Sequence, residues 1–248
     1  MTRPPPPTFD ERLEAIEQEA GRLAEVALSR LLAPVPSCPE WRVRDLLDHM
    51  SGVLGFWTAQ VAAADPDERH EFDQGEDLEG EELVDDLLGR ARDLTGALRD
   101  AGSSMPCWNW SGRDLDTGWV ARRMSLETAV HRYDGELSGG ETTEVAVPLS
   151  VDGLDERIYV HLASDVPDAP DAALGGSLCL ACSDTDAAFV VEVAHGRLQV
   201  RNTAGPASAF VRAPASELFL FSWNRVPLDN LSVTGDRDVA GAWVSLPV

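Results

Sequence analysis

Apolar residues recur at helical spacing in four segments of the first 140 residues, and polar residues fill the positions between them. These segments are residues 9–32, 43–64, 81–101 and 118–137. Apolar positions that step by three and four lie on one face of a helix and predict an amphipathic helix that buries that face. Four such helices of similar length predict a four-helix bundle.

The segments between these helices carry breaking and capping signals. Ser37 and Glu40 have the spacing of a capping box before the second helix, which we expect to begin near Val43. Residues 65–82 are rich in Asp and Glu and poor in apolar residues, so they predict an exposed connection.

The pattern changes after Ser138, where two glycines follow. Beyond this point the sequence predicts helices over 153–163, 215–223 and 236–243, and strands over 177–181, 187–194, 197–201, 209–212 and 231–233. His195 and Gly196 are expected to form a hairpin turn between two of the strands. We therefore predict an α+β protein with a helical bundle over residues 1–138 and a small α+β domain over residues 139–248.

The fourth helical segment places two polar residues where its apolar stripe should continue. Val120 and Met124 lead into Glu127 and His131, and residues four apart on a helix lie on the same face. A carboxylate and an imidazole on an inward face are costly to bury without a partner. A divalent metal ion is the simplest partner that satisfies both.

A third metal ligand is available on the second helical segment. His49 follows Leu46 by three residues and precedes Val53 by four, which places it on the inward face. Two histidines and one carboxylate leave a coordination position open, as in catalytic zinc sites, although iron, nickel and manganese accept the same ligands. The alternative is a buried hydrogen bond between Glu127 and His131 that fixes the register of the bundle.

Two carboxylates lie one helical turn from the candidate ligands. Asp134 follows His131, and Asp45 precedes His49. Either side chain could accept a hydrogen bond from the second ring nitrogen of a ligand histidine. A solvated or helix-capping role is the alternative for each.

Composition narrows the classes of function. The formal net charge of −23 disfavours nucleic acid and anionic membranes as partners, because their phosphates would be repelled. No apolar run has the length of a membrane span, and the first residues lack the apolar core of a secretory signal, so we expect a cytoplasmic protein. The twenty basic residues are all Arg, which excludes chemistry that needs a Schiff-base, pyridoxal-phosphate or Walker-type lysine.

The four cysteines do not form a convincing metal or redox motif. Cys179 and Cys182 are three apart in a predicted strand, where such residues point to opposite faces and would not bind one ion together. We expect these two residues, with Cys38 and Cys107, to be buried thiols in a reducing compartment.

Three stretches resemble one known family. Cys-Pro-Glu-Trp-Arg-Val-Arg-Asp-Leu-Leu-Asp-His49, the stretch over 122–134 and the stretch over 213–227 are similar, in this order, to sequences of the mycothiol-dependent maleylpyruvate isomerase family of the DinB-like superfamily. The resemblance implies a DinB-type bundle followed by a domain of sterol-carrier-like type. It also implies zinc held by His49, Glu127 and His131, and mycothiol bound with its sulfur against the metal.

The resemblance further implies a reaction class. A metal-bound thiol loses its proton and attacks an electrophilic carbon. Addition to a cis double bond followed by elimination would isomerise a substrate such as a cis-unsaturated keto acid, and release of the adduct would make the enzyme an S-transferase. Arg225 is expected to hold a substrate carboxylate. Arg122 and Arg123 are weaker candidates for this role, with a surface position as their alternative.

The sequence departs from the family pattern at three positions. Tyr133, Gly135 and Asn224 stand where Trp, Ala and Gly are commoner in the family. These positions affect the shape of the pocket, so they bear on the substrate more than on the metal.

Two other functions remain open from the residues. The first is a metal hydrolase in which water occupies the open position. The second is a non-catalytic protein that binds a small apolar ligand. The expected partners are a small electrophile and a thiol, and the chain is expected to be a monomer or a homodimer.

Overall fold

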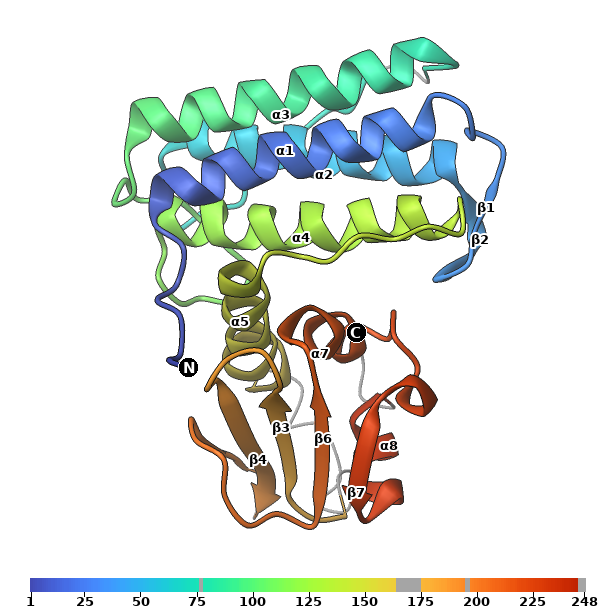
Figure 1. The fold of residues 1–248 in the computed structure, drawn as a ribbon. Coiled ribbons are helices and arrows are strands. Elements are labelled where there is room, and N and C mark those ends of the chain that lie inside the picture. Colours follow the sequence, from blue (N-terminus) through green and yellow to red (C-terminus); the bar gives the residue numbers. More distant parts are fainter. Residues whose placement is uncertain (76–77, 164–174, 195–196, 245–248) are drawn as a thin grey trace. The chain divides into compact units, whose positions relative to one another are not determined.

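The computed structural model describes the chain except for residues 76–77, 164–174, 195–196 and 245–248. The chain divides into two compact units. Pro7–Thr143 form a helical unit, and Met1–Pro6 join Glu144–Val248 in a second unit (Figure 1). Thr143 lies beyond the expected boundary at residue 138, and its backbone N–H donates to Glu136, 2.7 Å away, within the helical unit.

The helical unit is a four-helix bundle, as the apolar pattern predicted. Its helices are α1 (Phe9–Ala27), α2 (Val43–Ala63), α3 (Glu81–Ala101) and α4 (Thr117–Leu137). Helix α1 packs against α3 and α4, and α2 packs against the same two helices. Their apolar stripes form the core, which includes the fully buried side chains of Ile16, Leu23, Leu46, Leu54, Leu87, Leu94 and Val120.

Helix α4 differs from the other three because it is buried around most of its circumference. Its buried residues include charged and polar side chains on more than one face: Arg123, His131, Arg132, Asp134 and Glu136. Buried polar groups need partners within the protein or a bound ion. This helix therefore carries the chemistry of the unit.

A short hairpin precedes α2, where the sequence predicted a capping box. Strand β1 (Pro34–Val35) pairs antiparallel with β2 (Cys38–Arg42), and α1 ends at Ala27, five residues before the expected end at Leu32. The prediction that Ser37 caps α2 is wrong. Arg42 is the N-cap, and its backbone N–H donates to Asp45 at 2.8 Å.

The second unit is built on a five-stranded mixed sheet with the order β5-β4-β3-β6-β7. The strands are β3 (Leu178–Cys182), β4 (Ala188–Ala194), β5 (Arg197–Arg201), β6 (Ala209–Ala213) and β7 (Ser232–Gly235). Strands β3 and β6 are parallel, and the other neighbours are antiparallel. The predicted turn at His195 and Gly196 lies outside the described residues.

Helices complete this unit: α5 (Val147–Glu156), a π-helix (Arg157–Leu162), α7 (Ala215–Ser222), a 3-10 turn (Leu228–Asn230) and α8 (Arg237–Val244). The first of them was expected to begin at Gly153 but begins earlier, with a proline in its first turn. Gly153 serves close packing instead. A Cβ built there would lie 2.3 Å from the Phe219 ring, so only glycine lets α5 approach α7 this closely.

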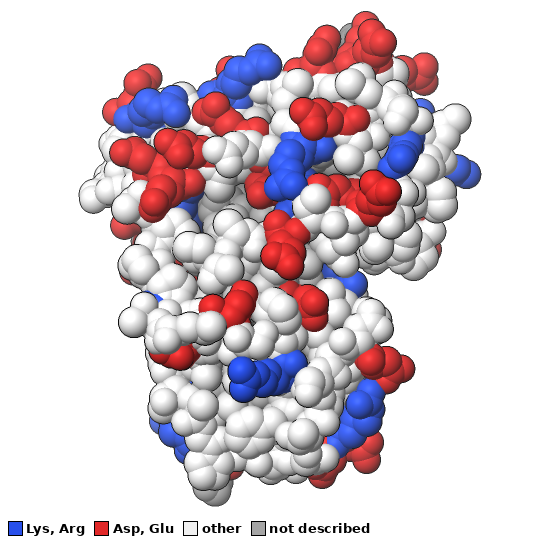
Figure 2. Space-filling model, in the orientation of Figure 1, with Lys and Arg blue, Asp and Glu red and all other residues white. Residues whose placement is uncertain are grey.

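Among the described residues, no helix has the length and apolar character that crossing a membrane requires. Acidic side chains are spread over the helical unit on the face drawn in Figure 2, with basic side chains among them. This surface agrees with the excess of Asp and Glu in the sequence.

Candidate metal centre

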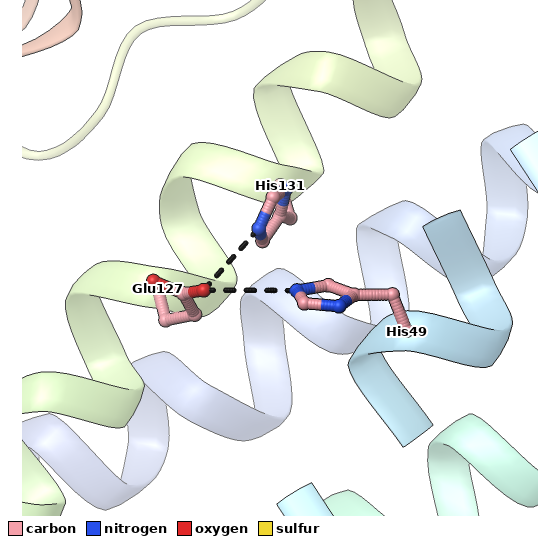
Figure 3. A group of neighbouring side chains, drawn as sticks. All are labelled: His49, Glu127 and His131. Carbon is pink, nitrogen blue, oxygen red and sulfur yellow. Dashed lines mark ion pairs between the residues drawn. The ribbon is translucent and has the colours of Figure 1, made fainter. Parts of the chain in front are cut away.

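Three side chains of the helical unit converge on one point. His49 comes from α2, and Glu127 and His131 lie one turn apart on α4 (Figure 3). Oε1 of Glu127 lies 3.3 Å from Nε2 of His131 and 3.9 Å from Nε2 of His49. One donor atom from each residue lies within 4.8 Å of the other two.

A carboxylate behind His131 fixes which ring nitrogen faces this point. Nδ1 of His131 lies 2.9 Å from Oδ2 of Asp134, a fully buried residue. Since an ionised carboxylate only accepts, Nδ1 carries the hydrogen and donates it. In the neutral ring, Nε2 is then an acceptor aimed at Glu127. Asp134 is itself held by the Ser37 hydroxyl, which donates to Oδ1 at 2.5 Å.

The two carboxylate oxygens of Glu127 have different neighbours. Arg123, one turn earlier on α4, donates to Oε2, while Oε1 faces the two imidazoles. Arg123 is 5% exposed, so the surface role considered for it is wrong, and its guanidinium serves Glu127. The four-residue spacing of Arg123 and Glu127 is the signal in the sequence that indicates this pair.

His49 is neutral at physiological pH. Burial and, to a smaller extent, the neighbouring His131 lower its pKa to about 4, while Asp48 acts in the opposite direction. A neutral imidazole is the form that binds a metal ion. The Trp41 ring lies beside both histidines, with ring centroids 4.9 Å from His49 and 6.3 Å from His131.

The donor atoms fit a divalent metal ion. Ligand atoms of a tetrahedral zinc site, at about 2.0–2.1 Å from the ion, are about 3.3 Å apart. The pair Glu127–His131 has this separation, and the pair Glu127–His49 is slightly longer. A divalent cation between these atoms would be attracted by the carboxylate and by the lone pairs of neutral imidazoles. The hydrogen bond from His131 to Asp134 also matches the usual surroundings of a metal-bound histidine.

A pocket of about 520 Å³ opens beside His49 within the helical unit. Its walls are aromatic and acidic: Trp41, Asp45, Asp48, His49, Gly52, Val53, Phe56, Trp57 and Gln74. The sequence analysis did not assign a role to Trp41, although this residue lies in the first stretch that resembles the family.

Asp45 and the other histidines of the described residues do not join this group. Asp45 caps α2, which is the alternative role considered for it. Nε2 of His70 lies 3.8 Å from Oδ2 of Asp65, on the connection after α2. His161 packs edge-on against Trp223 in the second unit, with ring centroids 4.9 Å apart.

Arg225 follows a strained turn in the second unit. Asn224 has a φ of 61°, the left-handed conformation in which glycine is most at ease. This conformation explains why glycine suits the position in related sequences. The Arg225 guanidinium donates to the Trp223 carbonyl at 2.7 Å, and the Arg157 guanidinium lies 5.3 Å from the Trp223 ring centroid.

The cysteines take no part in the candidate centre. All four are free thiols, and Cys107, Cys179 and Cys182 are buried. Burial raises the pKa of Cys107 to about 11 and that of Cys182 to about 12, so both remain protonated.

The fold and this centre define a class of protein: a four-helix bundle with a His–Glu–His group on facing helices, followed by a small α+β unit. Residues 13–135 match the family model described as the mycothiol maleylpyruvate isomerase N-terminal domain. The chain belongs to this family. No curated protein matches the sequence.

Solved structures share the fold. A crystal structure of mycothiol-dependent maleylpyruvate isomerase has 14% sequence identity and a TM-score of 0.65, covering 92% of this chain and 93% of that chain. A structure of a histidine-to-alanine mutant of that protein has 13% identity, with the same TM-score and coverage. A sterol carrier protein 2 like 2 from Aedes aegypti matches with a TM-score of 0.32, which supports no conclusion about the second unit.

Proposed function

We propose that this protein is a metal-dependent isomerase or S-transferase that uses a low-molecular-weight thiol, mycothiol, on a small electrophile. A cis-unsaturated keto acid such as maleylpyruvate is the first substrate to test. The metal, zinc in the first instance, is held by His49, Glu127 and His131. The family membership and the shared fold support this proposal.

The observation that carries the proposal is the orientation of His131. Because Nδ1 of His131 donates to Asp134, Nε2 of the same ring faces a Glu127 oxygen only 3.3 Å away. His49, half-buried and with a lowered pKa, adds the third ligand atom of the group. Two imidazoles and one carboxylate are the donor set of a catalytic zinc site with an open position.

The side chains around the metal position and Arg225 have separate roles in this proposal. Asp134 holds the tautomer of His131, and Arg123 holds one oxygen of Glu127 so that the other faces the histidines. A bound divalent metal would lower the pKa of a coordinating thiol and so supply a thiolate at neutral pH. Arg225 would orient a substrate carboxylate, for which its planar guanidinium is suited.

The test is a cis–trans isomerisation assay on the zinc-loaded protein, followed by absorbance. We expect turnover only when mycothiol is present, and none in Glu127→Gln. Glu40→Gln, a matched change at an exposed position of β2, should retain activity. Arg225→Lys should raise KM for a carboxylate substrate by about tenfold, because lysine cannot form the paired hydrogen bonds.

The other outcomes would each contradict the proposal. Metal-dependent hydrolysis of esters or amides without any thiol would favour a hydrolase. Tight binding of a small apolar molecule, without metal and without turnover, would favour a binding protein.

A further inference from the structure

The pocket beside His49 has an acidic rim. Asp45 and Asp48, four residues and one residue before His49, contribute carboxylates, and none of the described residues that line the pocket is Arg. Asp45 is partly offset by Arg44, whose Nε lies 3.9 Å away. Asp48 accepts a hydrogen bond from the neutral amide of Gln74 at 2.9 Å. This contact leaves the negative charge of Asp48 in place.

Asp48 precedes His49 directly in the sequence, and both side chains line the pocket. A molecule that fills the pocket and touches His49 would therefore experience the negative potential of Asp48.

The other walls of the pocket are aromatic. Trp41 flanks it next to the two histidines, and Phe56 and Trp57 line it further along α2, with their rings 5.2 Å apart. Aromatic faces bind carbon chains, sugar rings and cations. Phe56 already has a cation as its partner, because the Arg69 guanidinium lies 5.3 Å from its ring centroid. The preference for a cationic or uncharged group over a carboxylate therefore rests on Trp41 and on the two carboxylates of the rim.

We propose that this pocket binds the part of the thiol beyond its sulfur and selects thiols by charge, preferring cationic and uncharged groups to carboxylates. The inference rests on the proposed function, in which the sulfur of the thiol meets the metal at His49. It adds the class of thiol: one without a carboxylate near its sulfur. The thiol would be selected within the helical unit, in the pocket that His49 lines.

The expected size of the preference follows from simple electrostatics. Two carboxylates at the rim of a solvated pocket, screened at physiological ionic strength, should distinguish a cation from an anion by at most about tenfold in affinity. Because the pocket is open to solvent, this ratio should shrink as salt is added.

The experiment uses the full chain loaded with Co²⁺, whose visible absorption changes when a thiolate binds. Cysteamine, 2-mercaptoethanol and mercaptoacetate are titrated as cationic, uncharged and anionic probes of similar size. They are compared in the wild type, in Asp48→Asn, and in Asp93→Asn as a matched change at an exposed position of α3. Asn at position 48 can still accept from Gln74, so the local structure is retained.

The decisive quantity is the ratio of cysteamine to mercaptoacetate affinity in each protein, because the different acidities of the thiols cancel between variants. We expect this ratio to fall about threefold in Asp48→Asn and to stay unchanged in Asp93→Asn. Thiol binding with the same ratio in all three proteins would overturn this inference and leave the proposed function standing. A Co²⁺ spectrum that no thiol changes would overturn both.

Discussion

Helix α4 carries two polar clusters at neighbouring positions, and the two are built in opposite ways. One comprises Glu127 and His131 with His49 from α2. The other comprises Arg132 and Glu136 with Glu19 from α1. Both place two residues four apart on α4 against a residue of another helix. Because positions 131 and 132 point about 100° apart on a helix, the clusters face different partners.

The cluster around Arg132 is closed. Its guanidinium is fully buried and donates to Glu19 at 2.5 Å, to Glu136 at 2.7 Å and to the Thr143 carbonyl at 2.7 Å. One cation is thus surrounded by acceptors at hydrogen-bonding distance.

The cluster around His131 is arranged differently among the described residues. Oε1 of Glu127 faces the two imidazoles, 3.3 Å from Nε2 of His131 and 3.9 Å from Nε2 of His49, while Arg123 donates to the other oxygen of Glu127. The comparison teaches that two polar residues four apart on one helix can form either a buried ion-pair network that stabilises the fold or a candidate ligand site. The difference lies in whether the chain itself supplies the central cation.

The largest effect should follow from removing the cation of the closed cluster. Arg132→Met would leave Glu19 and Glu136 buried without their partner, and we expect it to lower the free energy of unfolding by about 3–5 kcal/mol. Urea denaturation measures this loss. Arg22→Met is the control, because the Arg22 side chain is 41% exposed and 3.8 Å from Glu136, and its loss should cost less than about 1 kcal/mol. An equal loss of unfolding free energy in both variants would contradict the view that Arg132 is the central cation of a closed cluster.

The stability of the cluster around His131 should depend on an added cation instead. Zinc at about 100 times its dissociation constant should raise the free energy of unfolding of the wild type by about 2.7 kcal/mol. His49→Ala should abolish this gain while changing the metal-free protein little, since His49 is only half-buried. Thermal unfolding with and without zinc tests both statements. A zinc-dependent gain that survives in His49→Ala would exclude His49 as a ligand.

The hydrogen bond between His131 and Asp134 should strengthen metal binding without contributing a ligand atom. Asp134→Asn removes the charge that fixes the tautomer, and we expect metal affinity to fall about 10–100-fold. Competition with a chelator of known affinity measures the change. If the affinity is unaltered, His131 does not bind the ion through Nε2.

The smallest effect concerns the hairpin. Ser37→Ala removes the hydroxyl that donates to Asp134, and it should reduce metal affinity by less than about tenfold, in the same chelator assay. Thr58→Ala provides the control, because its hydroxyl donates to the Leu54 carbonyl on α2 and should leave affinity unchanged. A loss in Ser37→Ala that exceeds the loss in Asp134→Asn would reverse this order.

The sequence predicts the four bundle helices and the three converging residues because both follow from helical periodicity. Each helix buries an apolar stripe, and the polar residues that interrupt that stripe must face each other across the bundle. Position alone thus brings His49 to Glu127 and His131.

What the sequence does not predict depends on contacts between distant residues. The hairpin before α2 has a strand of only two residues, and Ser37 and Glu40 imitate a capping box there. Ser37 instead reaches Asp134, 97 positions later, and no local pattern encodes this contact. Arg132 gives no periodic signal either, because α4 is buried on nearly all sides and lacks a polar face.

The most direct test of the account is the metal content of the purified protein by mass spectrometry, with His49→Ala, Glu127→Ala and His131→Ala measured beside it. We predict about one divalent metal ion per chain in the wild type after zinc is supplied, and its loss in all three variants, which should stay folded. A wild type that remains metal-free in the presence of zinc, or variants that keep the ion, would contradict the account.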